Sequence, residues 1–316
     1  MFIGVDHGTT AIRFATPEGR CWSLPRDEAS LCSAEYIVEL IHGNFGGEDI
    51  DLVALSYSMG DGISQIMRLC DAPNRGLICR EGAGIHVGGG TRVFEAIAES
   101  GWPAILLPGI HRGSDIDPRL MVFSHGMSPE KVGLAYGIFR NKSPSFIVCD
   151  ASSNTVTFAV LQGKIAGAID APIFAPGLMQ GPLDVQAIRD VDSGKMTANQ
   201  AFNCGGILSK MGKTSLEQCS ALQRSAALES LSLFAAMEIN ALLVLCRDLG
   251  EESPDIFMAG SPAAKLCGRV SELLGRNVEP LGRSAAAEGC AWIAKDVFAG
   301  EKSILGIAVD PRACYL

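Results

Sequence analysis

The spacing of hydrophobic and polar residues predicts short strands and helices that alternate along the chain. At the N-terminus, the apolar run 2–5 predicts a buried strand, and Asp6 follows it directly. Ile12 and Phe14 then alternate with polar positions, which is typical of a second strand. Because the small residues 8–10 join the two runs, the pattern predicts a β-hairpin with a carboxylate beside its turn.

A second copy of this pattern begins the other half of the chain. Residues 146–159 match residues 2–15 without a gap, and Asp150 takes the place of Asp6. Each copy consists of a strand, an aspartate, a small polar turn and another strand. Since long repeats are typical of duplicated architecture, we expect two similar domains, residues 1–145 and 146–316, with a nucleotide held between them.

The remaining elements complete an α/β order of mixed sheets flanked by helices. Ser128, Ser261 and Ser284 each precede a helical pattern and are predicted N-caps. The last helix carries so many small residues that another helix can approach it closely. The predicted strands cover residues 21–24, 51–57, 103–107, 165–169, 255–259 and 278–281, and the predicted helices cover 33–43, 92–100, 129–140, 184–192, 216–249, 262–275 and 285–298.

Length and composition bound the class of protein. At 316 residues, with 47% hydrophobic and 19% charged residues, the chain can form two globular domains with large cores. The net charge of −9 argues against a general nucleic-acid binder, which needs lysine and arginine. Eleven cysteines without a C-x-x-C pair favour reduced thiols in the cytoplasm.

Membrane insertion and secretion are not expected. The N-terminus lacks the basic and apolar regions of a signal peptide. The longest apolar stretch, 231–246, contains Glu238 and is shorter than the ~20 residues that a membrane span needs. We therefore predict a buried helix at this stretch.

One glycine-rich segment combines cationic residues with a possible helix start. The three glycines 88–90 fit neither a helix interior nor a strand interior. Thr91 is a predicted N-cap for a helix from Arg92, whose first N–H groups can bind an anion. A mobile surface loop is the alternative interpretation. Further histidines and arginines follow strands at residues 109–113 and 123–126.

Taken together, these segments resemble the superfamily of acetate kinases, sugar kinases, Hsp70 and actin. The resemblance spans the chain and implies a two-lobed, duplicated ribonuclease H-like fold of the actin-like ATPase type. The matching segments are residues 3–13 and 147–157 for the two phosphate motifs, 256–265 for the adenosine motif, and 129–140 and 285–291 for the connecting helices.

More narrowly, residues 2–14 resemble the methanogenesis marker protein 12 family of methanogenic archaea, which is similar to predicted butyrate kinases. This resemblance implies a strictly anaerobic host, consistent with many free thiols. It also implies the possibility of a homodimer, because dimers are common among acetate kinase relatives.

The resemblance implies ATP and Mg²⁺ as cofactors and a small carboxylate or related molecule as phosphoryl acceptor. Asp6 and Asp150 are implied to hold Mg²⁺ through water. Arginines suit the transferred phosphoryl group, because they bind phosphate bidentately. The implied phosphate-binding residues are Gly8, Thr9, Thr10, Ser152, Ser153, Asn154 and Thr155, the adenosine-binding residues are Gly260 and Ser261, the arginine candidates are Arg92, Arg112, Arg80 and Arg13, and the acceptor-orienting candidates are His86, His111 and His125.

The second phosphate motif departs from the family pattern. It normally has glycines after its aspartate, whereas here the turn is Ser152–Ser153–Asn154. Without glycine the backbone approaches a phosphate less closely, although these side chains can donate hydrogen bonds. Two alternatives to a kinase therefore stay open: an ATP-dependent switch that acts on a protein partner in cofactor assembly, and a degenerate scaffold without catalysis.

Overall fold

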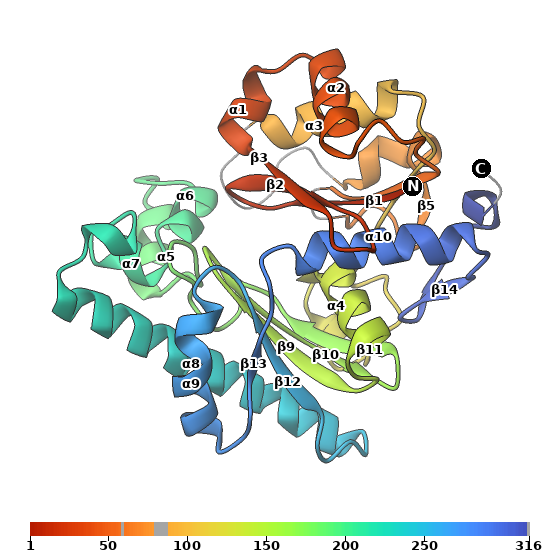
Figure 1. The fold of residues 1–316 in the computed structure, drawn as a ribbon. Helices are drawn as coiled ribbons and strands as arrows, with labels where there is room; N and C mark the ends of the chain where they lie inside the picture. The colour runs from red at the N-terminus through yellow and green to blue at the C-terminus, as the bar shows by residue number, and fades with distance from the viewer. Residues whose placement is uncertain (58–59, 79–87, 315–316) are drawn as a thin grey trace. The chain divides into compact units, whose positions relative to one another are not determined.

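The computed structural model describes residues 1–57, 60–78 and 88–314 (Figure 1). These residues form two compact units: those of 1–144 together with 284–314, and residues 145–283. The first boundary lies beside the expected one, but segment 284–314 groups with the N-terminal residues instead of with 146–283. The physical reason is that helix α10 (Ala285–Phe298) packs on strand β1 (Phe2–His7).

The first unit is built on a six-stranded mixed sheet with strand order β3-β2-β1-β4-β6-β5. The predicted hairpin is confirmed: β1 pairs with β2 antiparallel, and β1, β4 and β6 then run parallel. The further strands of this sheet are β2 (Ala11–Ala15), β3 (Cys21–Pro25), β4 (Leu52–Ser56), β5 (Met67–Arg68) and β6 (Ala104–Leu106).

Helices cover both faces of this sheet (Figure 1). Three of them, α1 (Arg26–Leu31), α2 (Ala34–Asn44) and α3 (Gly89–Glu99), bury apolar side chains against one face. Helices α4 (Pro129–Asn141) and α10 pack together with β1 and β4. A small ribbon of β7 (Ile110–His111) and β8 (His125–Met127), a short hairpin of β14 (Ser303–Ile304) and β15 (Ile307–Ala308), and the 3₁₀ turns η1 (Leu69–Asp71), η2 (Pro73–Gly76), η3 (Leu120–Val122) and η5 (Pro311–Cys314) complete the unit.

Glycines make the contact between α4 and α10 unusually close. A Cβ on Gly289 would lie 1.8 Å from the carbonyl oxygen of Gly133, and one on Gly4 would lie 2.0 Å from that of Ala287. Both distances are too short for any side chain. The expectation that the small face of α10 admits another helix is therefore confirmed, and the same face also admits strand β1.

The second unit repeats the topology of the first. Its five-stranded sheet has the order β11-β10-β9-β12-β13, with β9, β10 and β11 antiparallel and β9, β12 and β13 parallel. The predicted duplication is thereby confirmed at the level of strand order and direction. The strands are β9 (Phe146–Ala151), β10 (Thr155–Leu161), β11 (Lys164–Ile169), β12 (Asp255–Ala259) and β13 (Glu279–Pro280).

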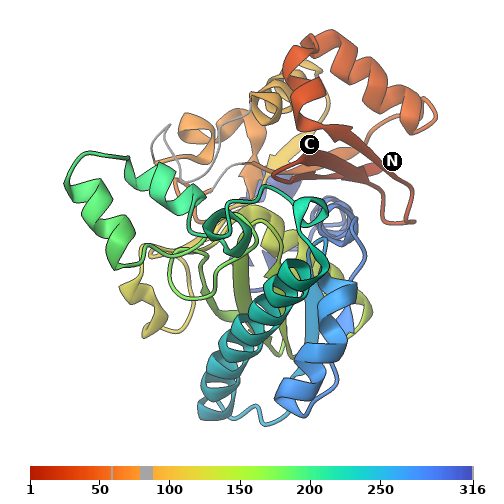
Figure 2. The ribbon, with the colours of Figure 1, turned by 90° about the vertical axis from the view of Figure 1, so that its left-hand side faces the viewer.

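A long helix, α8 (Ala221–Asp248), lies beside α9 (Ala263–Leu274) against this sheet (Figure 2). Among the described helices, only α8 is long and apolar enough to cross a membrane by length and composition. Its Leu231, Ile239 and Leu242 instead fill the core together with residues of β9, as the apolar pattern predicts. The unit also contains α5 (Val185–Asp192), α6 (Ala198–Asn203), α7 (Ile207–Lys210) and the 3₁₀ turn η4 (Leu216–Gln218).

The start of α3 differs from the prediction. The helix begins at Gly89, so two of the three glycines lie in its first turn and Thr91 is not its N-cap. The reason is steric, because a Cβ on Gly89 would lie 2.0 Å from the carbonyl oxygen of Arg26. The Thr91 hydroxyl instead lies 3.1 Å from the hydroxyl of Tyr57.

Candidate functional site

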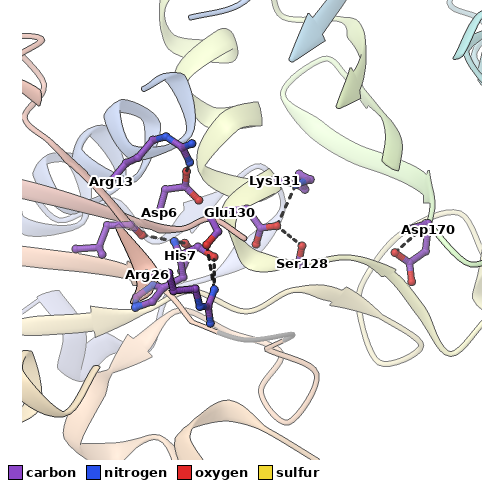
Figure 3. Close-up of polar contacts among 12 residues, drawn as sticks. Asp6, His7, Arg13, Arg26, Ser128, Glu130, Lys131 and Asp170 are labelled. Atoms are coloured by element: carbon purple, nitrogen blue, oxygen red, sulfur yellow. Dashed lines mark hydrogen bonds and ion pairs between the residues drawn. The ribbon is translucent and has the colours of Figure 1, made fainter. Parts of the chain in front are cut away.

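Asp6 is the buried centre of the candidate site in the first unit (Figure 3). It is only 5% exposed at the end of β1, directly opposite Arg13 on β2. Opposite residues of an antiparallel pair project to the same face, and the Arg13 Nη1 donates to Asp6 Oδ2 over 3.2 Å. The other oxygen, Oδ1, is buried and has no hydrogen-bond partner among the described residues. One acceptor of this carboxylate is therefore left unsatisfied by the described residues.

The turn after Asp6 is held from outside by Arg26, the first residue of α1. The Arg26 guanidinium donates to the carbonyl oxygens of Gly8 at 3.0 Å and His7 at 3.5 Å, and its own N–H donates to that of Thr10. Glycine is favoured at position 8, since a Cβ there would lie 2.8 Å from the backbone carbonyl oxygen of Ala11. Thr9 and Thr10 stay exposed, so the fixed turn presents its tip to solvent.

A second carboxylate, Glu130, stands in the first turn of α4. It accepts hydrogen bonds from Ser128 Oγ and from Lys131 Nζ, the latter at 3.0 Å. Burial raises the pKa of Glu130, but the positive charge of Lys131 and the two hydrogen bonds outweigh this and hold the pKa below its usual value. Glu130 is therefore ionised at neutral pH.

The electrostatics of Asp6 follow from this neighbourhood. Burial raises the pKa of Asp6 to about 6, and the negative charge of Glu130 adds to the shift, whereas Arg13 and Lys131 oppose it. The carboxylate is thus ionised at neutral pH but costly to keep charged. A nearby cation would relieve that cost.

His7 contributes no positive charge to this group. Its ring nitrogens are buried, and the ring stands edge-on to Tyr57 with centroids 5.4 Å apart. Burial and the adjacent Arg26 lower the pKa of His7 to about 4. The imidazole is therefore neutral at neutral pH and packs against Tyr57 beside the turn.

The residues around Asp6 fit a hydrated divalent cation better than a directly ligated one. No cluster of three or more potential metal ligands occurs among residues 1–57, 60–78 and 88–314. The buried, unsatisfied oxygen of Asp6 nevertheless offers one hard acceptor, which suits Mg²⁺ that keeps most of its water. Phosphate oxygens would have to supply the remaining ligands.

The second unit places Asp150 at the corresponding strand end, but in different surroundings. Asp150 lies opposite Val156 on β10, so the cross-strand cation of the first hairpin has no equivalent at that position. The turn Ser152–Asn154 is tight, with the Ser152 N–H donating to the Asn154 carbonyl oxygen over 2.8 Å.

A segment that we call the strap, residues 175–181, covers this second turn. The N–H of Leu178 donates to the Ser152 carbonyl oxygen at 2.9 Å, and those of Met179 and Gln180 donate to Ser153 at 2.9 and 2.8 Å. A Cβ on Gly177 would lie 2.3 Å from Asn154 Cα. The carbonyl face of the turn is thus occupied by the protein's own backbone.

Gly260 follows β12 beside Asp150. Its φ of +98° is in the left-handed region, and a Cβ would lie 2.1 Å from the carbonyl oxygen of Ala151. Close backbone packing therefore requires glycine here, whether or not a flat ligand also contacts it. The helix after it begins at Ala263, with Pro262 rather than the predicted Ser261 as N-cap.

The other predicted candidates do not converge on Asp6. Arg92 is exposed on α3, 3.7 Å from Glu95, and Arg112 donates to the Val122 carbonyl oxygen. Both ring nitrogens of His111 contact backbone, at Ile63 and Gly113. Among the described residues, no hydrogen bond or ion pair joins these three side chains to Asp6. His125 pairs with His111 across β7 and β8, and Arg80 and His86 lie outside the described residues.

The sequence interpretation missed three charged residues of the site: Arg26, Glu130 and Lys131. Glu130 follows the Ser-Pro helix start, a pattern that explains an acidic first turn without any ligand. Arg26 follows a predicted strand and carries no motif. Glu130 would have become a candidate only if the start of this helix had been predicted to lie near Asp6 at the end of the first strand.

Proteins of similar sequence come from methanogenic archaea. A UPF0285 protein of Methanosarcina mazei is 50% identical over 322 residues, covering 98% of this chain and 99% of its own. One from Methanocaldococcus jannaschii is 39% identical over 334 residues, covering 98% of each chain. No family model matches the chain.

Solved structures of similar fold include an acetate kinase and a propionate kinase. The acetate kinase of Entamoeba histolytica superposes with a TM-score of 0.62 at 12% identity, covering 94% of this chain and 99% of that one. A propionate kinase of Francisella tularensis gives 0.56 at 12% identity, covering 93% and 98%. At this identity the likeness shows the fold alone, which is a mixed α/β fold similar to that of acetate and propionate kinases.

Proposed function

The chain belongs to the UPF0285 family, and from its fold and its Asp6 centre we propose that it is an ATP- and Mg²⁺-dependent phosphotransferase acting on a small carboxylate or a related acceptor. The observation that carries the proposal is the buried Asp6 Oδ1, which has no hydrogen-bond partner among the described residues, next to a turn whose Thr9 and Thr10 are exposed. A deep carboxylate next to a small turn suits a metal–polyphosphate ligand.

Each residue of the first unit then has a chemical role. Asp6 would hold hydrated Mg²⁺, which supplies charge neutralisation for the transferred phosphoryl group when it is bound. Gly8, Thr9 and Thr10 would donate to phosphate oxygens, with Arg26 fixing their backbone. Arg13 would keep Asp6 oriented and ionised.

In the second unit, Asp150 is proposed to hold Mg²⁺ through water. Ser152, Ser153 and Asn154 would meet phosphate with their side chains, since the strap already uses the carbonyl face of the turn. Thr155, the fourth residue that the resemblance implied, is buried and its hydroxyl donates to the Pro176 carbonyl oxygen, so its side chain is not part of this proposal. Gly260 and Ser261 are proposed to contact the adenosine.

The overall reaction would form one bond and break one. An oxygen of the acceptor attacks the γ-phosphorus of ATP, the bond from that phosphorus to the bridging oxygen breaks, and ADP leaves with the bond's electron pair. With a carboxylate as acceptor, the product is an acyl phosphate. Arg92, Arg112, His111 and, outside the described residues, His86 remain proposed as acceptor-binding side chains.

Calorimetry with Mg²⁺ and ATP tests the nucleotide site. We expect saturable binding by the wild type, and by Asp255→Asn, which changes an exposed carboxylate at the opposite end of β12. Absence of both heat and a thermal shift in the wild type would remove the nucleotide proposal. A panel of short carboxylic acids, with hydroxylamine trapping of the product, then tests the acceptor class.

One observation favours a second candidate function, an ATP-dependent switch acting on a protein partner. The Ser152–Asn154 turn is glycine-free and covered by the strap, which suits nucleotide binding with slow turnover. Under this alternative, ATP would be hydrolysed without any trapped acyl phosphate. Turnover to ADP and free phosphate across the whole acid panel would support the switch and exclude the kinase.

The biological setting is part of the proposal. Relatives in methanogenic archaea support a cytoplasmic role in methanogenesis or in the assembly of its cofactors, and the narrower likeness to butyrate kinases belongs to the same hypothesis. A homodimer is proposed as well, and sedimentation of the purified protein tests it, since a monomer at micromolar concentration would exclude a stable dimer.

A further inference from the structure

A carboxyl group deep in the second unit links the strap to the hairpin beneath it. Glu238 lies near the middle of α8 and is fully buried. The Thr157 hydroxyl, on β10, donates to its Oε2 over 2.5 Å. The N–H of Ala175, the first strap residue, donates to its Oε1 over 3.3 Å. One side chain thus bridges three segments of the unit: β10, the strap and α8.

This arrangement is not what core packing alone would select. The surrounding stretch of α8 is apolar, and Leu231, Ile239 and Leu242 fill the same core. A buried acid costs free energy unless its hydrogen bonds are satisfied, and an apolar residue of similar size often serves stability as well or better. A carboxyl group at this position therefore calls for a role that an apolar side chain cannot perform.

Such a role is visible where the strap meets the turn. After Ala175, the strap is bonded to the hairpin residue by residue, beginning with the Thr155 hydroxyl, which donates to the Pro176 carbonyl oxygen over 3.2 Å. The N–H groups of 178–180 follow on the turn itself. Glu238 accepts the hydrogen bond from Ala175, the first residue of the strap, and the Thr157 hydroxyl binds Glu238 to the hairpin.

The comparison with the first hairpin strengthens the argument. In the sequence repeat, Thr157 occupies the place of Arg13, and each of the two residues binds a buried carboxyl group, Glu238 and Asp6 respectively. In the first unit that group belongs to the hairpin and faces the proposed ligand. In the second unit it comes from α8 and holds a covering segment in place.

We propose that Glu238 is a positioning residue that locks the strap onto the Ser152–Asn154 turn and thereby sets the shape in which this turn meets a nucleotide's phosphates. The inference rests on the proposed function, because phosphate binding gives the turn its purpose. Glu238 itself touches neither ligand nor metal and acts through Ala175 and Thr157.

Hydrogen exchange followed by mass spectrometry on the whole protein, without nucleotide, tests the lock directly. Glu238→Leu removes both hydrogen bonds, so we expect amides of 175–181 and 152–155 to exchange on the order of tenfold faster, as for the loss of about one buried hydrogen bond. Glu238→Gln keeps an acceptor for the Ala175 N–H and should restore protection to within about threefold of the wild type.

Two further variants keep the test decisive. Glu229→Gln alters an exposed carboxylate on the same helix, paired with Arg269, and should leave exchange at the strap unchanged. If Glu238→Leu does not fold, Thr157→Val replaces it, since it removes the hydroxyl that ties Glu238 to β10 and should loosen the same amides. Wild-type protection at 175–181 in Glu238→Leu, or in Thr157→Val if Glu238→Leu does not fold, would overturn the proposal. Uniform loss across β9, β10 and β12 would also overturn it, because Glu238 would then be a general core residue.

Binding of Mg²⁺ and ATP separates this inference from the proposed function. If the wild type binds, Glu238→Leu should weaken the affinity on the order of tenfold and Glu238→Gln should restore it. Unchanged affinity despite a loosened strap would overturn the link to the phosphates. If the wild type shows no binding, the proposed function and that link fail together, while the exchange result still decides whether Glu238 locks the strap.

Discussion

The two hairpins share one strand pairing but differ in what surrounds their turns. The first turn contains a glycine, exposes Thr9 and Thr10, and is held by the Arg26 guanidinium from outside the hairpin. The second contains no glycine and is covered by the strap, whose N–H groups occupy its carbonyl oxygens. Duplication thus kept the sheet and let the turn chemistry diverge.

Their registers differ by one residue, which explains part of this divergence. In the first hairpin Asp6 faces Arg13 and His7 faces Ile12, whereas in the second Asp150 faces Val156 and Ala151 faces Thr155. Because neighbouring positions on a strand project to opposite faces, a one-residue change exchanges the partners of every side chain. The first aspartate therefore faces Arg13 and the second faces Val156. The arginine itself is absent from the second copy, where Thr157 stands in the place of Arg13.

The largest expected effect concerns the buried acid of the second unit. Burial raises the pKa of Glu238 from 4.5 to about 8, and the nearby negative charge of Asp170 adds to the shift, while the Thr157 and Ala175 hydrogen bonds oppose it. The unfolded chain releases this proton first, so the free energy of unfolding should fall as pH rises from about 4.5 to about 8, by on the order of 4 kcal/mol.

Urea unfolding between pH 5 and pH 9 measures this loss. The decline above pH 6 should vanish in Glu238→Gln, which cannot titrate, and persist in Glu229→Gln. Asp6, whose pKa is about 6, contributes a decline of the same sign only at lower pH. Equal slopes above pH 6 in the wild type and in Glu238→Gln would contradict the assignment.

The next effect distinguishes the two aspartates of the repeat. Asp6→Asn removes the charge of the carboxylate whose buried Oδ1 is unsatisfied, so metal-dependent nucleotide binding or turnover should drop by on the order of 10²-fold or more. Asp150→Asn, without a cross-strand arginine and with a covered turn, should cost less, about tenfold. Calorimetry and ADP release measure both variants side by side. A larger loss in Asp150→Asn would reverse the ranking of the two hairpins.

Stability should reveal where the second unit depends on close backbone contact. Gly260→Ala forces a Cβ to within 2.1 Å of the Ala151 carbonyl oxygen at a φ of +98°, and should destabilise by about 2–4 kcal/mol. Gly268→Ala, inside α9 where a Cβ meets nothing within 4 Å, serves as the matched control. It should be neutral or stabilise by up to about 1 kcal/mol. Comparable urea midpoints for both variants would argue that the strand end is not tightly packed.

The smallest effect tests the support of the first turn. Arg26→Gln removes the charged donor to the Gly8 carbonyl oxygen and should destabilise the first unit by about 1 kcal/mol. Arg20→Gln, which removes an exposed ion pair with Glu48 and one hydrogen bond to the Phe45 carbonyl oxygen, should change the midpoint by less. Thermal melting of the two variants compares them. If Arg20→Gln proves the more harmful, Arg26 does not hold the turn.

Much of the fold was accessible from the sequence because its signals are local. Strand alternation, the N-cap at Ser128 and the ungapped repeat predicted both hairpins, helix α4 and the duplicated architecture. Asp6 was identified for the same reason, since a carboxylate after a buried strand is visible in a short window. The predicted start of α3 was wrong, because Gly89 packs against the backbone of Arg26, a residue far away along the chain.

The sequence by itself therefore determined the repeated units of strand, aspartate, turn and strand, because each depends on residues within one window. Only the tertiary structure decided what stands beside each aspartate: Glu130 of α4 near Asp6, and the strap with Glu238 over the second turn. It also decided that residues 284–314 group with the first unit. These choices depend on contacts between segments distant along the chain, whose free energy comes from burial and close approach and leaves no periodic pattern to read.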